Sequence, residues 1–262
     1  MKINDFGKLG MLVLVFCLFS FPSLAFAQEI PITKSQKMKD LIFDGKWTFV
    51  IEWKGSSLNS MRGEDEPIYI RTAHYENYIY VLLDVISDRK IDNNDFSIVC
   101  MSTIADNSTE SNVKRYCFKA GMGKNEAKTL KWFNEQEKFI EIKNHNDLVS
   151  IGSISDENDY YTKIPHASYE YRIPLDLFGR YDKYDFFVGV YDSAISKSFT
   201  WPQILETDLT SEIPSSQKWG MIFSPDKSLP EFELPFLMLF LSLFSIVIFT
   251  SKFSGLRFSS LR

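Results

Sequence analysis

The stretch from His166 to Asp192 constrains the fold of this chain more than any other. Residues 169–173 predict a strand, Pro174 ends it, and residues 186–191 predict a second strand after a short turn. Further upstream, residues 78–86 carry apolar side chains on both faces, which is typical of an interior strand covered on each side. Short strands separated by turn residues, with almost no helical periodicity, predict an all-β antiparallel β-sandwich.

The remaining strands and loops are expected from the same alternation of side chains. Strands are expected over residues 48–53, 68–73, 96–103, 113–120, 130–134, 138–143 and 148–154. A polar loop is expected over residues 55–66, and an irregular return over residues 192–201. A Phe- and Tyr-rich composition, with 15% aromatic residues, agrees with this β-rich pattern. A net charge of -5 disfavours a nucleic-acid ligand, because phosphate contacts need clustered Lys and Arg.

The first 27 residues resemble a secretory signal. Lys2 and Lys8 precede an apolar run, and Ala25-Phe26-Ala27 matches a small-x-small cleavage site, so we expect cleavage before Gln28. A retained membrane helix is the alternative, although the run is short for a bilayer.

A second apolar segment, residues 234–251, predicts a transmembrane helix. Eighteen residues at 1.5 Å each span roughly 27 Å, close to the hydrocarbon thickness of a bilayer. The basic tail that follows (252–262) favours a cytoplasmic carboxyl end and a cell-surface domain, anchored to the membrane. A buried globular helix is the alternative. The intervening chain divides into a lead-in (28–40), the sandwich (41–207) and a spacer (208–233).

Two cysteines remain after removal of the signal. A hairpin register that places Cys100 opposite Cys117 also pairs Val99 with Phe118 and Met101 with Tyr116, which favours a disulfide over two free thiols. Asn107 begins an N-glycosylation sequon at the expected hairpin tip.

The carboxyl-terminal region resembles a known sorting signal. Pro230-Glu231-Phe232, the apolar span and the basic tail occur in the order of the PEF-type signals of archaeal surface proteins. The resemblance implies processing by an archaeosortase and transfer to a lipid. Retention of the span stays open as the alternative.

The central domain resembles family 9 carbohydrate-binding modules and the related DOMON-type sandwiches. The motifs that carry the resemblance are Asp44-Gly45-Lys46-Trp47, residues 68–74, residues 79–85, the loop with Asp95, Glu170-x-x-Ile173-Pro174 and residues 189–192. The resemblance covers residues 41–201. It implies an antiparallel sandwich that binds sugars or, in some branches, haem, and that calcium often braces.

Three tryptophans are candidates for contact with a sugar because flat rings stack on sugar faces: Trp132, Trp201 and Trp219. Core aromatics are the alternative reading. Clustered oxygens predict a calcium site in one loop: Asp88, Asp92, Asn94 and Asp95. A solvated acidic loop is the alternative, and Asp84 and Asp192 stand at strand ends, where they could equally cap turns.

Haem is the second cofactor considered. Its candidate axial ligands are His74, His145, His166, Met101 and Met122. The sequence contains no G-x-S-x-G, H-E-x-x-H or P-loop motif, so we expect no catalysis. The patterns predict an exported, membrane-anchored sandwich, and the family resemblance implies that it binds carbohydrate or envelope polysaccharide. A haem-carrying redox domain and a structural or adhesion protein remain the alternatives.

Overall fold

The computed structural model describes residues 28–104, 113–122 and 127–225. The expected signal segment, Asn107, Pro230-Glu231-Phe232 and the apolar span 234–251 therefore lie outside the described residues. Within the described ranges, no helix has the length and apolar character needed to cross a bilayer. All described helices are short 3-10 turns: η1 (Gln36–Asp40), η3 (Leu175–Leu177) and η4 (Ser216–Lys218).

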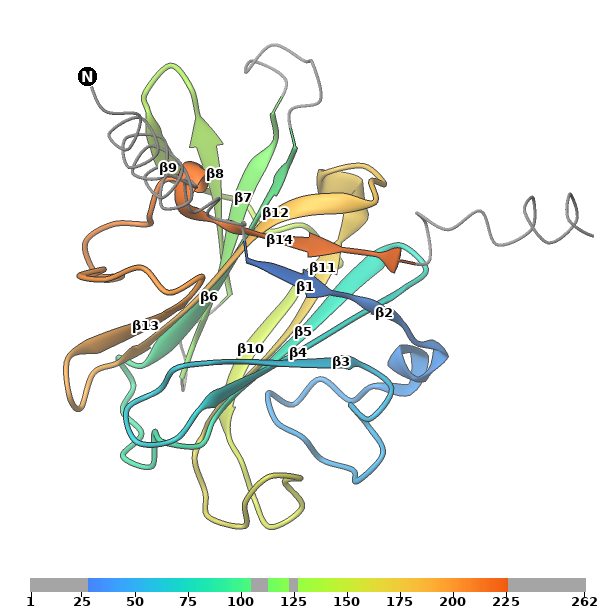
Figure 1. Cartoon of the computed structure of the whole chain (residues 1–262), viewed down its shortest axis with the longest axis vertical. Coiled ribbons are helices and arrows are strands. Elements are labelled where there is room, and N and C mark those ends of the chain that lie inside the picture. The colour runs from blue at the N-terminus through green and yellow to red at the C-terminus, as the bar shows by residue number, and fades with distance from the viewer. Residues whose placement is uncertain (1–27, 105–112, 123–126, 226–262) are drawn as a thin grey trace, which may run out of the picture.

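Two β-sheets pack face to face and form a sandwich (Figure 1), which confirms the predicted fold class. The first sheet contains, in spatial order, β1 (Glu29–Pro31), β14 (Gly220–Phe223), β12 (Lys183–Asp192), β6 (Phe96–Thr103), β7 (Arg115–Gly121), β8 (Lys128–Phe133) and β9 (Lys138–Ile142), with β13 (Lys197–Trp201) also paired to β12. The second sheet contains β10 (Val149–Ile154), β11 (Ala167–Pro174), β5 (Tyr78–Val85), β4 (Ile68–Tyr75) and β2 (Thr33–Lys34), with β3 (Ser57–Met61) also paired to β4.

Strand β5 shows why its sequence carries apolar residues on both faces. Ile79 and Val81 point into the main core between the sheets. Tyr80 and Leu82 point to the outer face, where they pack with Trp47 in a second cluster. The prediction of an interior strand covered on each side is confirmed.

The disulfide between Cys100 and Cys117 joins β6 to β7. The two cysteines are opposite one another in the ladder, as are Val99 and Phe118. The predicted register is therefore confirmed. Both cysteines are fully buried on the outer face of the first sheet, where Phe187 and Trp219 belong to the same cluster.

The prediction of a strand over residues 48–53 is wrong, because this segment forms a tight loop. The Glu52 carboxylate accepts the backbone N–H groups of Ile42 at 3.2 Å and Thr48 at 2.7 Å, so those donors are used locally and not in a ladder. The loop buries Trp47 and Trp53 completely and leaves Val50 60% exposed. The alternation of apolar residues in this segment therefore comes from an exposed turn between two buried tryptophans, and not from a strand.

Three boundaries also differ from the prediction. The expected polar loop 55–66 contains β3, whose side chains are mostly polar because β3 lies at an edge of its sheet. The expected irregular return contains β13, which pairs with β12. The lead-in and the described part of the spacer contribute strands to the sandwich: β1 and β14 pair in parallel, and β2 pairs in parallel with β4. These short strands carry few residues, so their periodicity is too brief to detect in sequence.

Candidate functional site

Three aspartates from separate segments converge at one end of the sandwich. Asp88 follows β5, Asp95 precedes β6, and Asp192 ends β12. One carboxylate oxygen from each residue lies within 4.8 Å of the other two, and all three side chains are buried. The pairing of Tyr191 with Phe96 explains the meeting, because it brings the end of β12 beside the start of β6. We call this group the aspartate cluster.

Two of the three aspartates in the cluster accept hydrogen bonds from neighbouring groups in the described part of the chain, and the third does not. The Asp95 Oδ1 atom accepts from the backbone N–H and the hydroxyl of Ser193, at 2.8 and 2.6 Å. The Asp192 Oδ1 atom accepts the N–H of Ala194 at 3.0 Å and therefore caps the turn after β12. Asp88 is only 1% exposed, and neither of its carboxylate oxygens has a hydrogen-bond partner among the described residues. The cluster thus contains two positioned carboxylates and one unsatisfied carboxylate.

Burial and the neighbouring carboxylates raise the pKa of Asp88 to about 7. Burial and the charge of Asp95 also raise the pKa of Asp192. No Lys, Arg or His in the described part of the chain forms an ion pair with any of the three. A bound cation would reverse this unfavourable electrostatics, because its charge favours the ionised form of each carboxylate.

The donor set fits a hard cation such as calcium. All the ligands that the cluster offers are carboxylate oxygens, which calcium prefers, and the two unpaired oxygens of Asp88 are available for coordination. The described residues form two buried acidic clusters that can bind a metal such as calcium. In the aspartate cluster, all the donor atoms are oxygens.

Only part of the calcium site expected from the sequence is in this cluster. Asp88 and Asp95 belong to it, whereas Asp92 is exposed and accepts the N–H of Asn94 at 2.9 Å. Asp192 is the ligand candidate that sequence reasoning did not assign to the site. Its position at the end of a strand was visible, but its proximity to Asp95 depends on the β6–β12 register, which the sequence does not specify.

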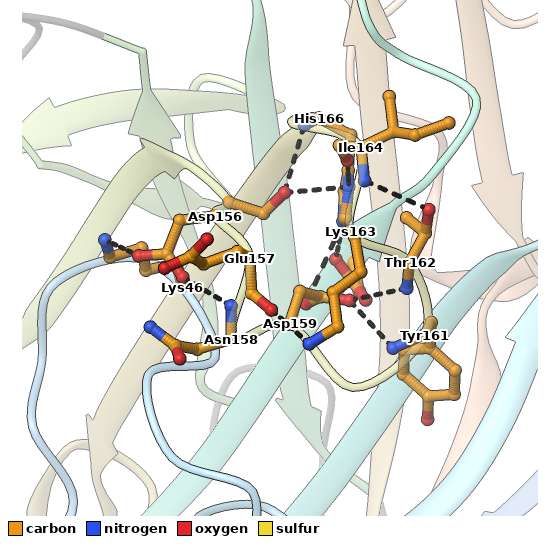
Figure 2. A network of polar contacts seen from close by, with 12 residues as sticks. Lys46, Asp156, Glu157, Asn158, Asp159, Tyr161, Thr162, Lys163, Ile164 and His166 are labelled. Carbon is orange, nitrogen blue, oxygen red and sulfur yellow. Dashed lines mark hydrogen bonds and ion pairs between the residues drawn. The ribbon is translucent and has the colours of Figure 1, made fainter.

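A second buried acidic group contains a histidine. Asp84, Asp159 and His166 have ligand atoms within 4.8 Å of one another, and all three residues are buried. Figure 2 shows the loop that carries Asp159 folded against His166, with the Asp159 carboxylate accepting the N–H groups of Tyr161 and Thr162 at 2.8 and 3.1 Å. We call this group the histidine network.

The histidine network contains its own cation. The His166 Nε2 atom lies 2.5 Å from the Asp84 Oδ1 atom, and the Nδ1 atom lies 2.8 Å from the carbonyl oxygen of Ile164. Burial raises the pKa of Asp84 to about 6, so at neutral pH Asp84 is mostly ionised and, like the Ile164 carbonyl oxygen, can only accept a hydrogen bond. This geometry favours an imidazolium that donates from both nitrogens. Burial alone would lower the pKa of His166, but the hydrogen bond and charge of Asp84 outweigh it, and the pKa is raised. The described residues give the aspartate cluster no equivalent internal cation.

A surface groove of 610 Å³ adjoins the aspartate cluster. Its lining includes residues directly beside two cluster members, Asn94 next to Asp95 and Ser193 next to Asp192. Tyr191 is partly exposed there, and its ring centroid lies 5.3 Å from that of Phe96. The remaining lining residues are Lys119, Gly121, Lys128 and Thr210. Gly121 lies opposite Phe96 in the ladder.

The three tryptophans chosen from the sequence lie elsewhere. Trp201 is 7% exposed and packs in the main core, 5.9 Å from Phe186. Trp219 is 6% exposed, and its Nε1–H donates to the Pro214 carbonyl oxygen at 2.9 Å. Trp132 is partly exposed on β8. Phe139 contacts both Trp132 and Trp219, so the structure brings these two together on the outer face of the first sheet, away from Trp201.

The candidate haem ligands are also dispersed. Met101 and Met122 are buried in the main core, and His166 has both ring nitrogens hydrogen-bonded. His145 accepts the N–H of Asp147 at 3.1 Å, and His74 lies 3.1 Å from the Ser224 hydroxyl. Ligation by His166 would require breaking its contact with Asp84 or with Ile164.

Comparisons with known proteins give structural similarity at low sequence identity. No protein-family model matches the sequence, and no curated protein matches it. A Bacteroides uniformis protein for which carbohydrate binding is inferred has a TM-score of 0.49 and 9% identity, with 76% of this chain and 99% of that chain covered.

Two structures of a family 9 carbohydrate-binding module from Caldicellulosiruptor kristjanssonii are also similar. The complex with glucose has a TM-score of 0.46 and 13% identity, covering 75% of this chain and 95% of that one. The complex with cellotriose has a TM-score of 0.46 and 12% identity, covering 79% and 100%. Identities this low do not transfer a binding site to this chain, so its site must be argued from its own residues.

Proposed function

We propose that this protein is a non-catalytic module that binds glycan in the groove beside Tyr191, with calcium in the aspartate cluster. The observation that carries the proposal is the adjacency of the groove and the cluster: Asn94 and Ser193 line the groove, and their chain neighbours Asp95 and Asp192 are cluster carboxylates. A cation bound there would fix the loops that form one wall of the groove. The export and membrane anchoring expected from the sequence would place this groove outside the cell.

The chemistry of the groove suits a sugar. The partly exposed ring of Tyr191 offers a flat apolar face, and the ring of Phe96 packs against it. Asn94, Ser193 and Thr210 add hydrogen-bonding groups around it, as expected of a site that fixes the orientation of a polyhydroxylated ligand.

The same lining supports a binding role over hydrolysis. Glycoside hydrolysis requires two carboxyl groups that flank the scissile bond. Among the described residues that line the groove there is no Asp or Glu. The cluster carboxylates are at most 6% exposed, so they do not reach a ligand in the groove.

A glycan array with the full chain in detergent micelles and calcium tests the proposal. We expect binding to at least one glycan and a loss of about tenfold or more in affinity on Tyr191→Ala, the effect typical of a central aromatic contact. Tyr160→Ala is the matched control, because Tyr160 is 50% exposed but stacks on Trp47, outside the groove.

Absence of binding to every glycan would contradict the proposal. Loss of binding in Tyr160→Ala but not in Tyr191→Ala would place the sugar at the Trp47–Tyr160 stack instead and would contradict the assignment of the groove.

A further inference from the structure

Two lysines face each other across the floor of the groove. Lys119 on β7 and Lys128 on β8 are directly opposite in the ladder, an arrangement in which like charges repel. Lys119 is half-buried, and its Nζ atom lies 3.4 Å from the centroid of the Phe96 ring. The fold therefore holds an ammonium group at a defined position beside the aromatic wall of the groove.

Only one of these lysines has an acidic partner in the described part of the chain. The Lys128 Nζ atom lies 3.0 Å from the Glu141 carboxylate, at the exposed edge of the sheet. Lys119 contacts the face of Phe96 but forms no ion pair among the described residues. Burial lowers the pKa of Lys119, and repulsion from Lys128 lowers it further. A half-buried cation of this kind is unfavourable unless an anion accompanies it.

We propose that the glycan bound in this groove is acidic and that its carboxylate or sulfate group pairs with Lys119 while a neighbouring sugar ring contacts Tyr191. An anion at this position would neutralise Lys119 and screen it from Lys128, and an ammonium–carboxylate contact would form in a partly water-excluded place, where charge-assisted hydrogen bonds are strong. This inference rests on the proposed glycan-binding function and names the ligand class.

A nucleic acid would also bring negative charge to Lys119, but it suits this groove less well than an acidic glycan does. Affinity for a phosphate backbone depends on several Lys and Arg that each neutralise a phosphate. Among the described residues, the lining of the groove offers two cations, of which Lys128 already has Glu141, and the whole chain has a net charge of -5. A single ammonium group that has no acidic partner in the described ranges suits a glycan with isolated acidic groups.

Matched pairs of ligands test the inference with the full chain in detergent micelles and calcium. The carboxylate pair is oligogalacturonate and its fully methyl-esterified form, and the sulfate pair is dextran sulfate and dextran. We expect the acidic member of at least one pair to bind tenfold or more tightly than its neutral counterpart. Lys119→Met should remove that preference because it keeps the apolar stem and deletes the charge, whereas Lys119→Arg should retain it.

The outcomes separate this inference from the proposed function. Binding to neutral glycans that Tyr191→Ala abolishes and Lys119→Met leaves unchanged, with no preference for acidic members, would overturn the acidic ligand class and leave glycan binding in place. A preference for acidic members that survives Lys119→Met would assign the charge recognition to another surface and also overturn it. Absence of binding to any of the four probes and to the array would overturn both.

Discussion

The carboxylate of Glu170 accepts a hydrogen bond from the backbone N–H of Gly45 at 2.9 Å, although the two residues are 125 positions apart. The same side chain accepts the N–H of Asp44 at 3.1 Å and the indole N–H of Trp53 at 3.0 Å. Glu170 is fully buried on β11. Two of the motifs behind the family resemblance, Asp44-Gly45-Lys46-Trp47 and Glu170-x-x-Ile173-Pro174, therefore form one structural unit that fixes the 41–56 segment onto the second sheet.

Removal of this acceptor should destabilise the domain strongly. Glu170→Ala leaves three N–H donors without their partner, and unsatisfied buried donors cost about 1–3 kcal/mol each, so we expect a loss of about 3 kcal/mol or more in the free energy of unfolding. Urea denaturation measures the change. Glu212→Ala is the control, because Glu212 is exposed, and it should change stability by no more than about 0.5 kcal/mol. Equal effects of the two substitutions would contradict the role of Glu170.

Gly45 should not tolerate a side chain. Its φ of +85° is unfavourable for other residues, and an added Cβ would lie 2.7 Å from the Ser153 Cβ atom. Gly179 is a matched control, since its φ is +93° but an added Cβ would meet only the Tyr181 ring, at 3.2 Å. We expect Gly179→Ala to cost about 1–2 kcal/mol from the backbone conformation alone and Gly45→Ala to cost clearly more in thermal or urea denaturation. A smaller cost for Gly45→Ala would show that Ser153 moves aside.

Calcium should stabilise the protein through Asp88 and not through Asp92. At a calcium concentration 100 times the dissociation constant, binding to the native state adds about 2.7 kcal/mol, which appears as a rise in melting temperature that EGTA reverses. Asp88→Asn should abolish the rise, because Asp88 supplies the two unpaired oxygens of the aspartate cluster. Asp92→Asn should retain it, because the Asp92 Oδ1 atom is bonded to Asn94 outside the cluster. The opposite result would restore the loop site expected from the sequence.

The histidine network should make stability depend on pH in a definite direction. Asp84 and His166 titrate as a pair: burial raises the pKa of Asp84 to about 6, and the pKa of His166 is raised above 6.5 in the folded state. The folded pair therefore binds more protons than the unfolded pair, so the stability that these protons contribute is largest at low pH and decreases as the pH rises through the folded-state pKa values. The decrease is at most about 1.4 kcal/mol per pH unit for one proton.

Urea denaturation of the wild type and of the double variant Asp84→Asn, His166→Asn, in calcium between pH 5 and 9, checks this expectation, because the variant lacks both titrating groups. The difference in unfolding free energy between the two proteins should be largest at pH 5 and should shrink toward pH 9. A difference that is constant with pH would mean that the folded pair binds no extra proton. NMR of the His166 ring would report the same protonation state directly.

Much of the sandwich follows from local sequence pattern, because long strands repeat their alternation often enough to be recognised. β5 and the β6–β7 hairpin with its cysteine pair are examples, and the predicted register of the hairpin is confirmed. β14 has four residues and β1 three, and such short strands are defined by the neighbours they pair with. The prediction for residues 48–53 fails for a different reason. The Glu52 carboxylate accepts backbone N–H groups locally, and this arrangement depends on the tertiary burial of Trp47 and Trp53.

The candidate site is harder to predict than the fold because it is assembled from segments distant in sequence. Asp88 and Asp95 stand in one acidic loop, so sequence reasoning found them. Asp192 and the groove residue Tyr191 lie about 100 positions later, and only the β6–β12 register brings them to that loop. The tryptophans were chosen as large flat rings, but Trp201 is buried in the main core and Trp219 is buried in the cluster on the outer face of the first sheet.

The position of β14 between β12 and β1 determines where this domain can be cut. A fragment that stops at residue 207, the end of the sandwich expected from the sequence, lacks β14. The β12 backbone from Lys183 to Phe186 then keeps β6 on one edge but loses its ladder partner on the other, and β1 loses the strand with which it pairs. An exposed strand edge of this kind pairs readily with another copy and promotes aggregation. Expression of a soluble domain should therefore begin no later than Gln28 and continue through Ser224, whose N–H donates to the Asp182 carbonyl oxygen and closes that edge.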